Sequence, residues 1–186
     1  GSEKISSVLN WQDRMTCPHF GDGAGAVVLR PAAAGIELLG TSLGTDGIGE
    51  GLLTLSAGGS RIPASRDSVT RGLHFLKMQG RPMFKKAVPA MCAAATSALS
   101  RSGLKVADVD CIIPHQSNRR LIEAFAQRLG ARPGQLFLNL EQCGNTSAAS
   151  IPLALHEARQ QGKIRPGDLT LLVAFGAGLT YGGALV

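Results

Sequence analysis

Short apolar runs that alternate with longer segments of helical spacing are the feature that most restricts the fold of this chain. The runs at residues 110–114 and 170–175 are almost entirely apolar, as in strands that are covered on both faces. Helices are expected at 82–103, 121–129 and 146–161, and further strands at 20–29, 35–43 and 179–186. This order of elements indicates an α/β protein, with an α/β/α layer sandwich around a mixed five-stranded sheet.

Two expected helices require more cover than one sandwich provides. Residues 85–102 and 146–161 are rich in alanine and apolar on more than one side. Such helices are typically buried on all sides, so we expect a second sandwich to pack against this one. Residues 44–70 are rich in glycine and serine, and we expect them to form a long loop of the kind that is often functional.

The composition favours contact with another macromolecule. Only 17% of the 186 residues are charged, below the roughly 25% of a typical free-standing domain. The formal net charge of +6 and the pI near 9.6 favour an acidic partner. One Trp and one Tyr leave few stacking surfaces for bases, so nucleic acid is not expected, whereas an acidic carrier protein or a phosphate-bearing cofactor fits.

The cysteines and the ends of the chain bear on its location. The four cysteines show no paired or metal-binding spacing, and we expect reduced, mainly structural thiols in a cytoplasmic protein: Cys17, Cys92, Cys111 and Cys143. No apolar run approaches the ~18 residues of a membrane span, so no membrane partner is expected. Gly1-Ser2 is typical of the remnant of an expression tag, which leaves residues 3–186 as the folded unit.

Two polar segments follow expected strands and carry the candidate chemistry. His115 comes directly after residues 110–114, and Asn145 lies between Gly144 and the small residues that open a helix. Each has an ordinary structural interpretation, as a capping histidine and as a helix N-cap. Ligands of α/β proteins bind where strands end, and a neutral imidazole and a carboxamide that converge on one oxygen can stabilise an enolate.

Two glycine-rich turns are weaker signals. Gly176-Ala177-Gly178 follows an apolar strand, and its backbone N–H groups can form an oxyanion hole, although most such turns are only tight turns. Residues 21–26 lack the Lys-Ser/Thr of a phosphate-binding loop and precede a strand, which excludes that role.

Basic residues gather near the His115 segment and the helix expected at 82–103. Each one alone is typical of a solvated helix face, but together they predict a docking surface for an anionic partner: Lys85, Lys86, Arg119, Arg120 and Arg128.

On these residues the chain resembles the C-terminal half of the β-ketoacyl-acyl-carrier-protein synthase III family, the initiating condensing enzymes of bacterial fatty acid synthesis in the thiolase-like superfamily. The resemblance covers nearly the whole chain after Gly1-Ser2. It runs through residues 20–29, 52–60, 76–78, 84–85, 115–118, 144–152 and 175–182. Several separate motifs in the same order make it specific.

The resemblance implies a reaction in two stages with no cofactor beyond its substrates. A cysteine takes an acyl group from acyl-CoA, and malonyl-acyl-carrier protein then loses carbon dioxide and attacks that thioester. The positions that match His115 and Asn145 hydrogen-bond the malonyl thioester carbonyl. The position that matches Ala177 offers its backbone N–H to the acyl oxygen; glycine is common there, but only the backbone is needed.

The resemblance also implies binding roles. Gly80, Ser117 and Asn118 match positions that line the pantetheine tunnel, and Phe84 matches a wall of it. The basic patch that receives the acidic carrier protein is matched by Lys85, Arg120 and Arg128. His19 and Pro89 depart from the pattern of the family at positions that we expect to be structural.

The nucleophilic cysteine of the family lies in an N-terminal half that this chain does not include, together with the residues that hold the CoA adenine. We therefore expect the chain to be inactive alone, to need that missing half as a partner, and to form homo-oligomers through an exposed apolar face. Two alternatives remain: a related condensing enzyme of secondary metabolism, of polyketide or quinolone type, and a non-catalytic partner subunit.

Overall fold

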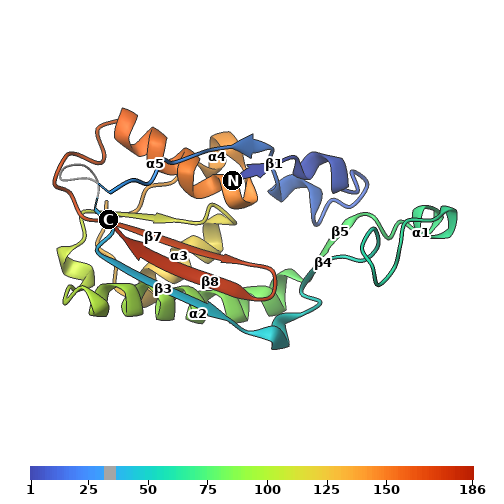
Figure 1. Ribbon diagram of the computed structural model, residues 1–186, viewed down its shortest axis with the longest axis horizontal. Coiled ribbons are helices and arrows are strands. Elements are labelled where there is room, and N and C mark those ends of the chain that lie inside the picture. Colours follow the sequence, from blue (N-terminus) through green and yellow to red (C-terminus); the bar gives the residue numbers. More distant parts are fainter. Residues whose placement is uncertain (32–36) are drawn as a thin grey trace.

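A four-stranded mixed sheet forms the centre of the computed structural model, which describes residues 1–31 and 37–186 (Figure 1). Its strands, in spatial order, are β3 (Gly40–Thr45), β8 (Thr180–Leu185), β7 (Thr170–Gly176) and β6 (Cys111–Pro114). β6 and β7 are parallel, whereas β8 runs antiparallel to both β7 and β3. The carboxyl ends of β6 and β7 therefore lie at the same edge of the sheet.

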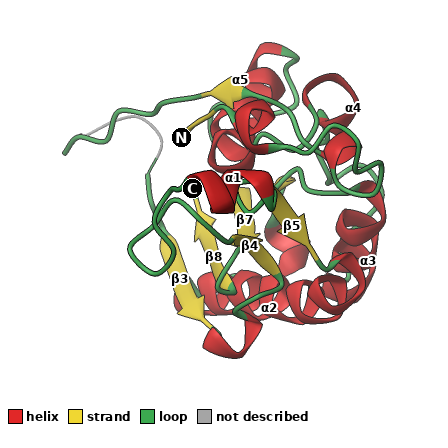
Figure 2. Ribbon diagram, turned by 90° about the vertical axis from the view of Figure 1, so that its right-hand side faces the viewer, coloured by secondary structure: helices red, strands yellow, loops and turns green. Residues whose placement is uncertain are grey.

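Helices cover both faces of this sheet, which confirms the α/β/α sandwich. α2 (Gly80–Arg101) packs on β3, β8 and β7 and contacts α3 (Arg119–Leu129), whereas α5 (Ser150–Gln160) lies on the opposite side (Figure 1, Figure 2). Alternation along β6 divides its side chains between two cores. Ile112 joins the core under α2 and α3, and Ile113 joins the core under α5. The remaining short elements are α4 (Leu140–Cys143) and 3-10 turns at Ile5–Val8, Cys17–His19, Gly47–Gly49, Val106–Asp108 and Ser147–Ala149.

The three expected helices are present, with ends that differ by a few residues from those predicted. Asn118 caps α3 by accepting hydrogen bonds from the backbone N–H groups of Arg120 and Leu121, and Gly130 ends it in the left-handed conformation at φ 79°. α2 continues through Pro89 as one helix. Its outer face stays exposed at Ala93 within this chain, so burial on all sides stays a prediction.

The prediction of five strands is wrong by one. The segment 20–29 contributes only β2 (Gly23–Ala24), which pairs with β1 (Ser2–Glu3) outside the main sheet. Val28 and Leu29 are 91% and 85% exposed, because no strand among the described residues lies beside them. The strand expected at 35–43 is β3 and begins at Gly40; residues 35 and 36 lie outside the described residues.

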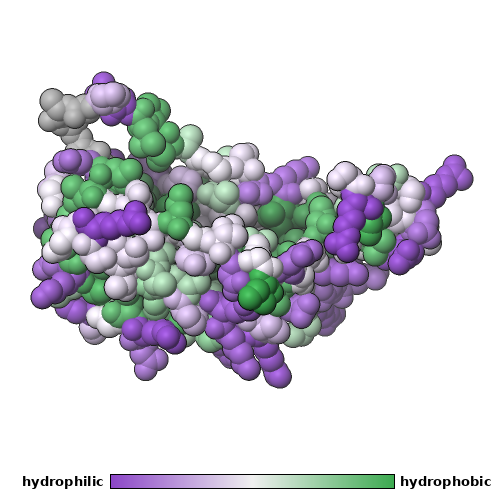
Figure 3. Space-filling model, turned by 60° about the horizontal axis from the view of Figure 1, so that its bottom comes forward, coloured by the Kyte–Doolittle hydropathy of each residue, from purple (hydrophilic) through white to green (hydrophobic). Residues whose placement is uncertain are grey.

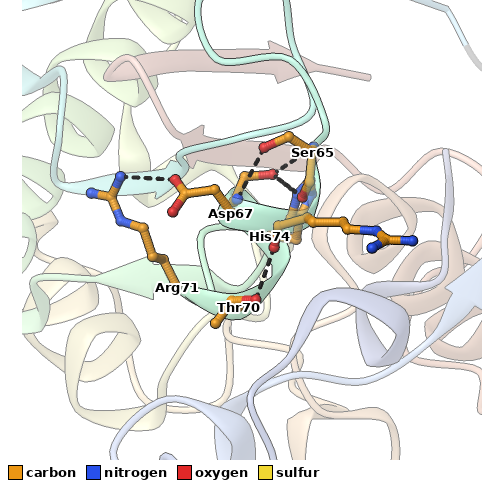
Figure 4. A network of polar contacts seen from close by, with 7 residues as sticks. Ser65, Asp67, Thr70, Arg71 and His74 are labelled. Atoms are coloured by element: carbon orange, nitrogen blue, oxygen red, sulfur yellow. Dashed lines mark hydrogen bonds and ion pairs between the residues drawn. The ribbon is translucent and has the colours of Figure 1, made fainter.

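The prediction of a long loop at 44–70 is also wrong, because a short strand and a short helix form within these residues. Residues 53–78, here called the arm, contain β4 (Leu53–Leu55), α1 (Arg66–Thr70) and β5 (Leu76–Met78), and they project from the sandwich (Figure 1). Figure 4 shows the polar contacts of the arm. Ser65 and Ser68 form a reciprocal capping box at the start of α1, and the Ser68 hydroxyl lies 2.9 Å from Nε2 of His74.

Candidate active site

His115 lies at the edge of the sheet where β6 ends. Its backbone N–H donates to the Val173 carbonyl of β7, 2.7 Å away, and its ring packs edge to face on Phe175 with centroids 5.5 Å apart. Nδ1 lies 2.6 Å from the Ser150 hydroxyl at the start of α5. Burial lowers the pKa of the imidazole from 6.5 to about 4, because the buried ring is poorly solvated when charged. His115 is therefore neutral at physiological pH.

Asn145 is held by its backbone between two residues of the N-terminal segment. Its N–H donates to the His19 carbonyl and its carbonyl accepts from the Gly21 N–H, each at 2.9 Å. The side-chain Oδ1 accepts from the Ser147 backbone N–H, also at 2.9 Å. Asn145 is not the N-cap of a helix, because its Oδ1 closes a two-residue turn and α5 begins at Ser150 after Ala149. Its Nδ2 makes no hydrogen bond within the described residues, and its catalytic role stays a prediction.

Close backbone contact around Asn145 explains the local glycines. A Cβ on Gly21 would overlap the carbonyl oxygen of Cys143. Gly144 has φ 67° and lies against the backbone of Phe20, so a side chain there would be both strained and crowded. Ser147 adopts φ 51°, an unfavourable conformation for a residue with a Cβ, and its N–H donates to the Asn145 side chain. The glycine-rich segment after Phe20 supports this turn instead of leading into a buried strand.

One cavity of about 1270 Å³ is lined by His115, Asn145 and Ala177. These residues come from the ends of β6 and β7 and from the turn before α5, so the fold assembles segments that are far apart in the sequence. The four residues that were expected to line a pantetheine tunnel face the same cavity: Gly80, Phe84, Ser117 and Asn118.

Ala177 follows the last residue of β7 in a tight turn. Its carbonyl accepts from the N–H and the hydroxyl of Thr180, at 3.2 and 3.1 Å. Its own N–H donates no hydrogen bond within residues 1–31 and 37–186, which leaves it open to an acceptor.

The five basic residues of the expected docking surface differ in their contacts. Lys86 pairs with Asp46 at 2.8 Å, and Arg119 contacts two glutamates, so these two cations are already engaged. The other three, Lys85, Arg120 and Arg128, form no ion pair within the described residues. Lys85 and Arg120 line the cavity, whereas Arg128 is exposed and does not line it.

No cysteine in the described part of the chain lines the cavity. Burial raises the pKa of the Cys92 thiol, and it raises that of Cys111 to about 11, which disfavours the nucleophilic thiolate. Burial also raises the pKa of Cys143, the cysteine nearest to Asn145 in sequence. Cys92 is half-buried against the carbonyl of Phe125 and packs on the core under α2 and α3.

Two supporting side chains were not assigned roles from the sequence. Ser150 contacts His115 directly, and the fully buried Gln116 bonds the Pro114 carbonyl and the Asn139 N–H. Their proximity to the two motifs was the available signal, but only the fold shows which oxygen meets which nitrogen. Within the described ranges, no cluster of His, Cys, Asp and Glu could hold a metal ion. Nor does any helix found there have the length and apolarity to cross a membrane.

Comparison with known proteins identifies the family of the chain. The family pattern described as 3-oxoacyl-[acyl-carrier-protein (ACP)] synthase III C terminal matches residues 99–186. A second pattern, described as 3-oxoacyl-[acyl-carrier-protein (ACP)] synthase III, matches residues 1–47. The chain belongs to the 3-oxoacyl-acyl-carrier-protein synthase III family. The resemblance inferred from the motifs is thereby confirmed, and so is the thiolase-like fold class that it implied.

The individual relatives are longer than this chain. The β-ketoacyl-[acyl-carrier-protein] synthase III of Desulfitobacterium hafniense DCB-2 is 50% identical over all 186 residues, which span 56% of that relative. The crystal structure of the Aquifex aeolicus VF5 enzyme is 41% identical with a TM-score of 0.86, and the match covers 100% of this chain and 55% of that one. The priming β-ketosynthase of the R1128 polyketide pathway is 35% identical with a TM-score of 0.85, over 99% of this chain and 55% of that one. The chain thus spans about half the length of the curated relatives it matches.

Proposed function

We propose that residues 3–186 are the C-terminal half of a condensing enzyme and supply its decarboxylation pair, His115 and Asn145. The observation that carries this proposal is that each side chain has one end fixed by the protein and one nitrogen that makes no hydrogen bond within the described residues. Nδ1 of His115 meets Ser150, and Oδ1 of Asn145 meets Ser147. Nε2 and Nδ2 therefore remain to donate hydrogen bonds in the cavity that both residues line.

The proposed chemistry is a decarboxylative Claisen condensation. The bond between the malonyl α-carbon and its carboxylate breaks, carbon dioxide leaves, and the electron pair moves into the thioester carbonyl to give an enolate. His115 and Asn145 donate hydrogen bonds to that oxygen as its negative charge develops. The enolate carbon then attacks the acyl-cysteine thioester, a carbon–carbon bond forms, and the cysteine leaves as a thiolate. The Ala177 N–H stabilises the oxyanion of this second step.

The acyl-accepting cysteine is assigned to the other half of the enzyme. None of the described residues of this chain places a thiol in the cavity, and burial raises the pKa of three of its four cysteines. We expect acyl-CoA and malonyl-acyl-carrier protein to bind only when the two halves are joined, with the pantetheine arm along Phe84, Ser117 and Asn118. Lys85, Arg120 and Arg128, which form no ion pair within the described residues, are proposed to meet the acidic carrier protein.

The test combines this chain with a separately produced N-terminal half of a family member. Alone, the chain is expected to form no 3-oxoacyl product from acyl-CoA and malonyl-acyl-carrier protein; the mixture is expected to form it. In the mixture, His115→Ala or Asn145→Ala should each lower malonyl decarboxylation by roughly 10²–10³-fold, the usual effect of removing one oxyanion donor. The exposed His156 of α5 provides the control His156→Ala. Full decarboxylation by both cavity variants contradicts the proposal.

Secondary metabolism is a second candidate, favoured by the likeness to the R1128 priming β-ketosynthase. The decarboxylation pair serves either pathway, so the acyl donor that the joined halves accept decides between them. A non-catalytic partner subunit is disfavoured. A site without catalytic function would not require Nε2 of His115 and Nδ2 of Asn145 to stay available in the cavity.

A further inference from the structure

Ser150 is the first residue of α5 and is only 2% exposed. Its Oγ lies 2.6 Å from Nδ1 of His115 and 3.4 Å from the backbone nitrogen of Gln116. We infer that Ser150 is a positioning residue whose hydroxyl donates to Nδ1 and so keeps the single ring proton of His115 on Nε2. The inference rests on the proposed function, because only the Nε2–H form lets His115 donate to a thioester oxygen.

The two partners of the Ser150 hydroxyl decide the direction of its hydrogen bond to His115. The Gln116 N–H can only donate, so the weaker 3.4 Å contact uses a lone pair of the Ser150 oxygen. The hydroxyl proton then needs an acceptor, and within the described residues Nδ1 of His115 is the one in reach. If Nδ1 carried the proton instead, Oγ would face two donors and its buried O–H would have no acceptor, at a cost of about 1–3 kcal/mol.

The rest of the His115 environment fixes the ring but leaves its tautomer open. The backbone is held by Val173 on one side and by the Ser117 N–H on the other, and Phe175 packs edge to face on the ring. None of these contacts involves a ring nitrogen. Because burial keeps the imidazole neutral, one nitrogen holds the only proton, and the Ser150 contact determines which one.

The chain provides a matched control for this contact. Ser117 is also buried and lines the same cavity, yet its Oγ makes no hydrogen bond within the described part of the chain. Ser117→Ala and Ser150→Ala thus delete the same group from the same cavity, and only the second removes a partner of His115.

The experiment measures the ring nitrogens of His115 by NMR in the 186-residue chain labelled with ¹⁵N-histidine at neutral pH, with the resonances assigned through His115→Gln. The wild type is expected to show a protonated Nε2 and an unprotonated, hydrogen-bonded Nδ1. Ser150→Ala should shift the Nδ1 resonance toward that of a free ring nitrogen or populate the second tautomer. Ser150→Thr should restore the wild-type pattern, and Ser117→Ala should leave it unchanged.

A protonated Nδ1 in the wild type overturns the inference. So does an Nδ1 chemical shift that is the same in the wild type and in Ser150→Ala. If the alanine variant does not fold, Ser150→Cys keeps the shape of the side chain with a larger atom and a weaker donor, and it should give the same shift in smaller measure. These readouts do not depend on turnover. Failure of the proposed function would instead appear as unchanged decarboxylation by both His115→Ala and Asn145→Ala, whichever nitrogen carries the proton.

Discussion

The residues of the cavity support one kind of chemistry, the stabilisation of negative charge by neutral donors. His115 is kept uncharged by burial, and Asn145 has its acceptor end occupied by Ser147. Ala177 adds a backbone N–H. Neutral donors suit an oxygen that becomes negative only during the reaction, because they would not hold the proposed malonyl substrate too tightly beforehand.

Burial of His115 predicts a loss of stability in mild acid. The pKa falls from 6.5 in the unfolded chain to about 4 in the folded chain, so between these values the unfolded chain binds more protons. The contribution is fully present above pH 6.5 and is lost as the pH falls toward 4. At about 1.4 kcal/mol per pKa unit, the total is on the order of 3 kcal/mol. Urea unfolding of the wild type and of His115→Gln, at about pH 7 and about pH 4.5, measures it.

The stability of His115→Gln should fall less than that of the wild type over this interval, whereas the exposed control His156→Gln should follow the wild type. Carboxylates contribute in a different window. Hydrogen bonds from Ser6 lower the pKa of Asp22, and a hydrogen bond from Lys86 lowers that of Asp46, so their contributions are lost only as the pH falls through and below 3.8. Equal acid sensitivity of wild type and His115→Gln between pH 6.5 and 4 would contradict the prediction.

For single residues, the sequence indicated the candidate hydrogen-bond donors of the cavity but not their orientation. Strand ends and glycine spacing suffice to single out His115 and Asn145. The partner of the imidazole is Ser150, 35 residues away along the chain, whereas the partner of the amide is the backbone N–H of Ser147, two residues away. The pair of His115 and Ser150 forms only when β6 and the start of α5 meet in space, which no local pattern encodes.

Among the elements, the turn before α5 depends on the glycine-rich N-terminal segment. We predict that Gly21→Ala destabilises the chain by about 1–3 kcal/mol, because the new Cβ would overlap the Cys143 carbonyl. It should also displace Asn145, whose backbone bonds to Gly21. Urea unfolding and the side-chain amide resonance of Asn145 measure the two effects. Gly59→Ala is the control, since a Cβ there meets open space; equal costs for the two variants would refute the crowding argument.

The arm is expected to behave as a separate local unit. Ser65→Ala removes the side chain that accepts the Ser68 N–H at 3.1 Å, and loss of an N-cap costs about 1 kcal/mol. Because β4, α1 and β5 project from the sandwich, the loss should appear as faster hydrogen exchange confined to residues 53–78. Ser60→Ala, at an exposed serine of the same arm, should change nothing. Faster exchange throughout the sheet would disprove this independence.

The arm and the missing fifth strand are the elements that the sequence pattern did not predict correctly. β4 and β5 have three residues each, too few for a period of two to emerge, and the Ser65–Ser68 capping box lies in a stretch that otherwise reads as loop. The opposite error occurs at Val28, where apolar residues predict a strand but no neighbour among the described residues pairs with it. Long segments such as α2, with many apolar positions, were predictable because periodicity accumulates with length.

For the molecule as a whole, the same exposed residues are where the proposed N-terminal half would pack. Val28, Leu29 and Leu43 are 91%, 85% and 89% exposed, and Figure 3 shows apolar patches open on one face. A chain that spans about half of its curated relatives would expose such surfaces if the other half normally covers them. The low charge of 17%, read from the composition as a sign of protein contact, has the same explanation.

These surfaces predict self-association of the isolated chain. Burying one large apolar side chain contributes roughly 1.5–3 kcal/mol, enough for a few of them to hold copies together at moderate concentration. Sedimentation velocity should show species larger than 19.3 kDa that increase with concentration. Val28→Lys with Leu43→Lys should reduce them by removing apolar contact and adding charge. Gln127→Lys with Gln160→Lys adds the same charge at exposed polar positions and should not. A wild type that stays monomeric, or a control that dissociates equally well, would refute association through these apolar residues.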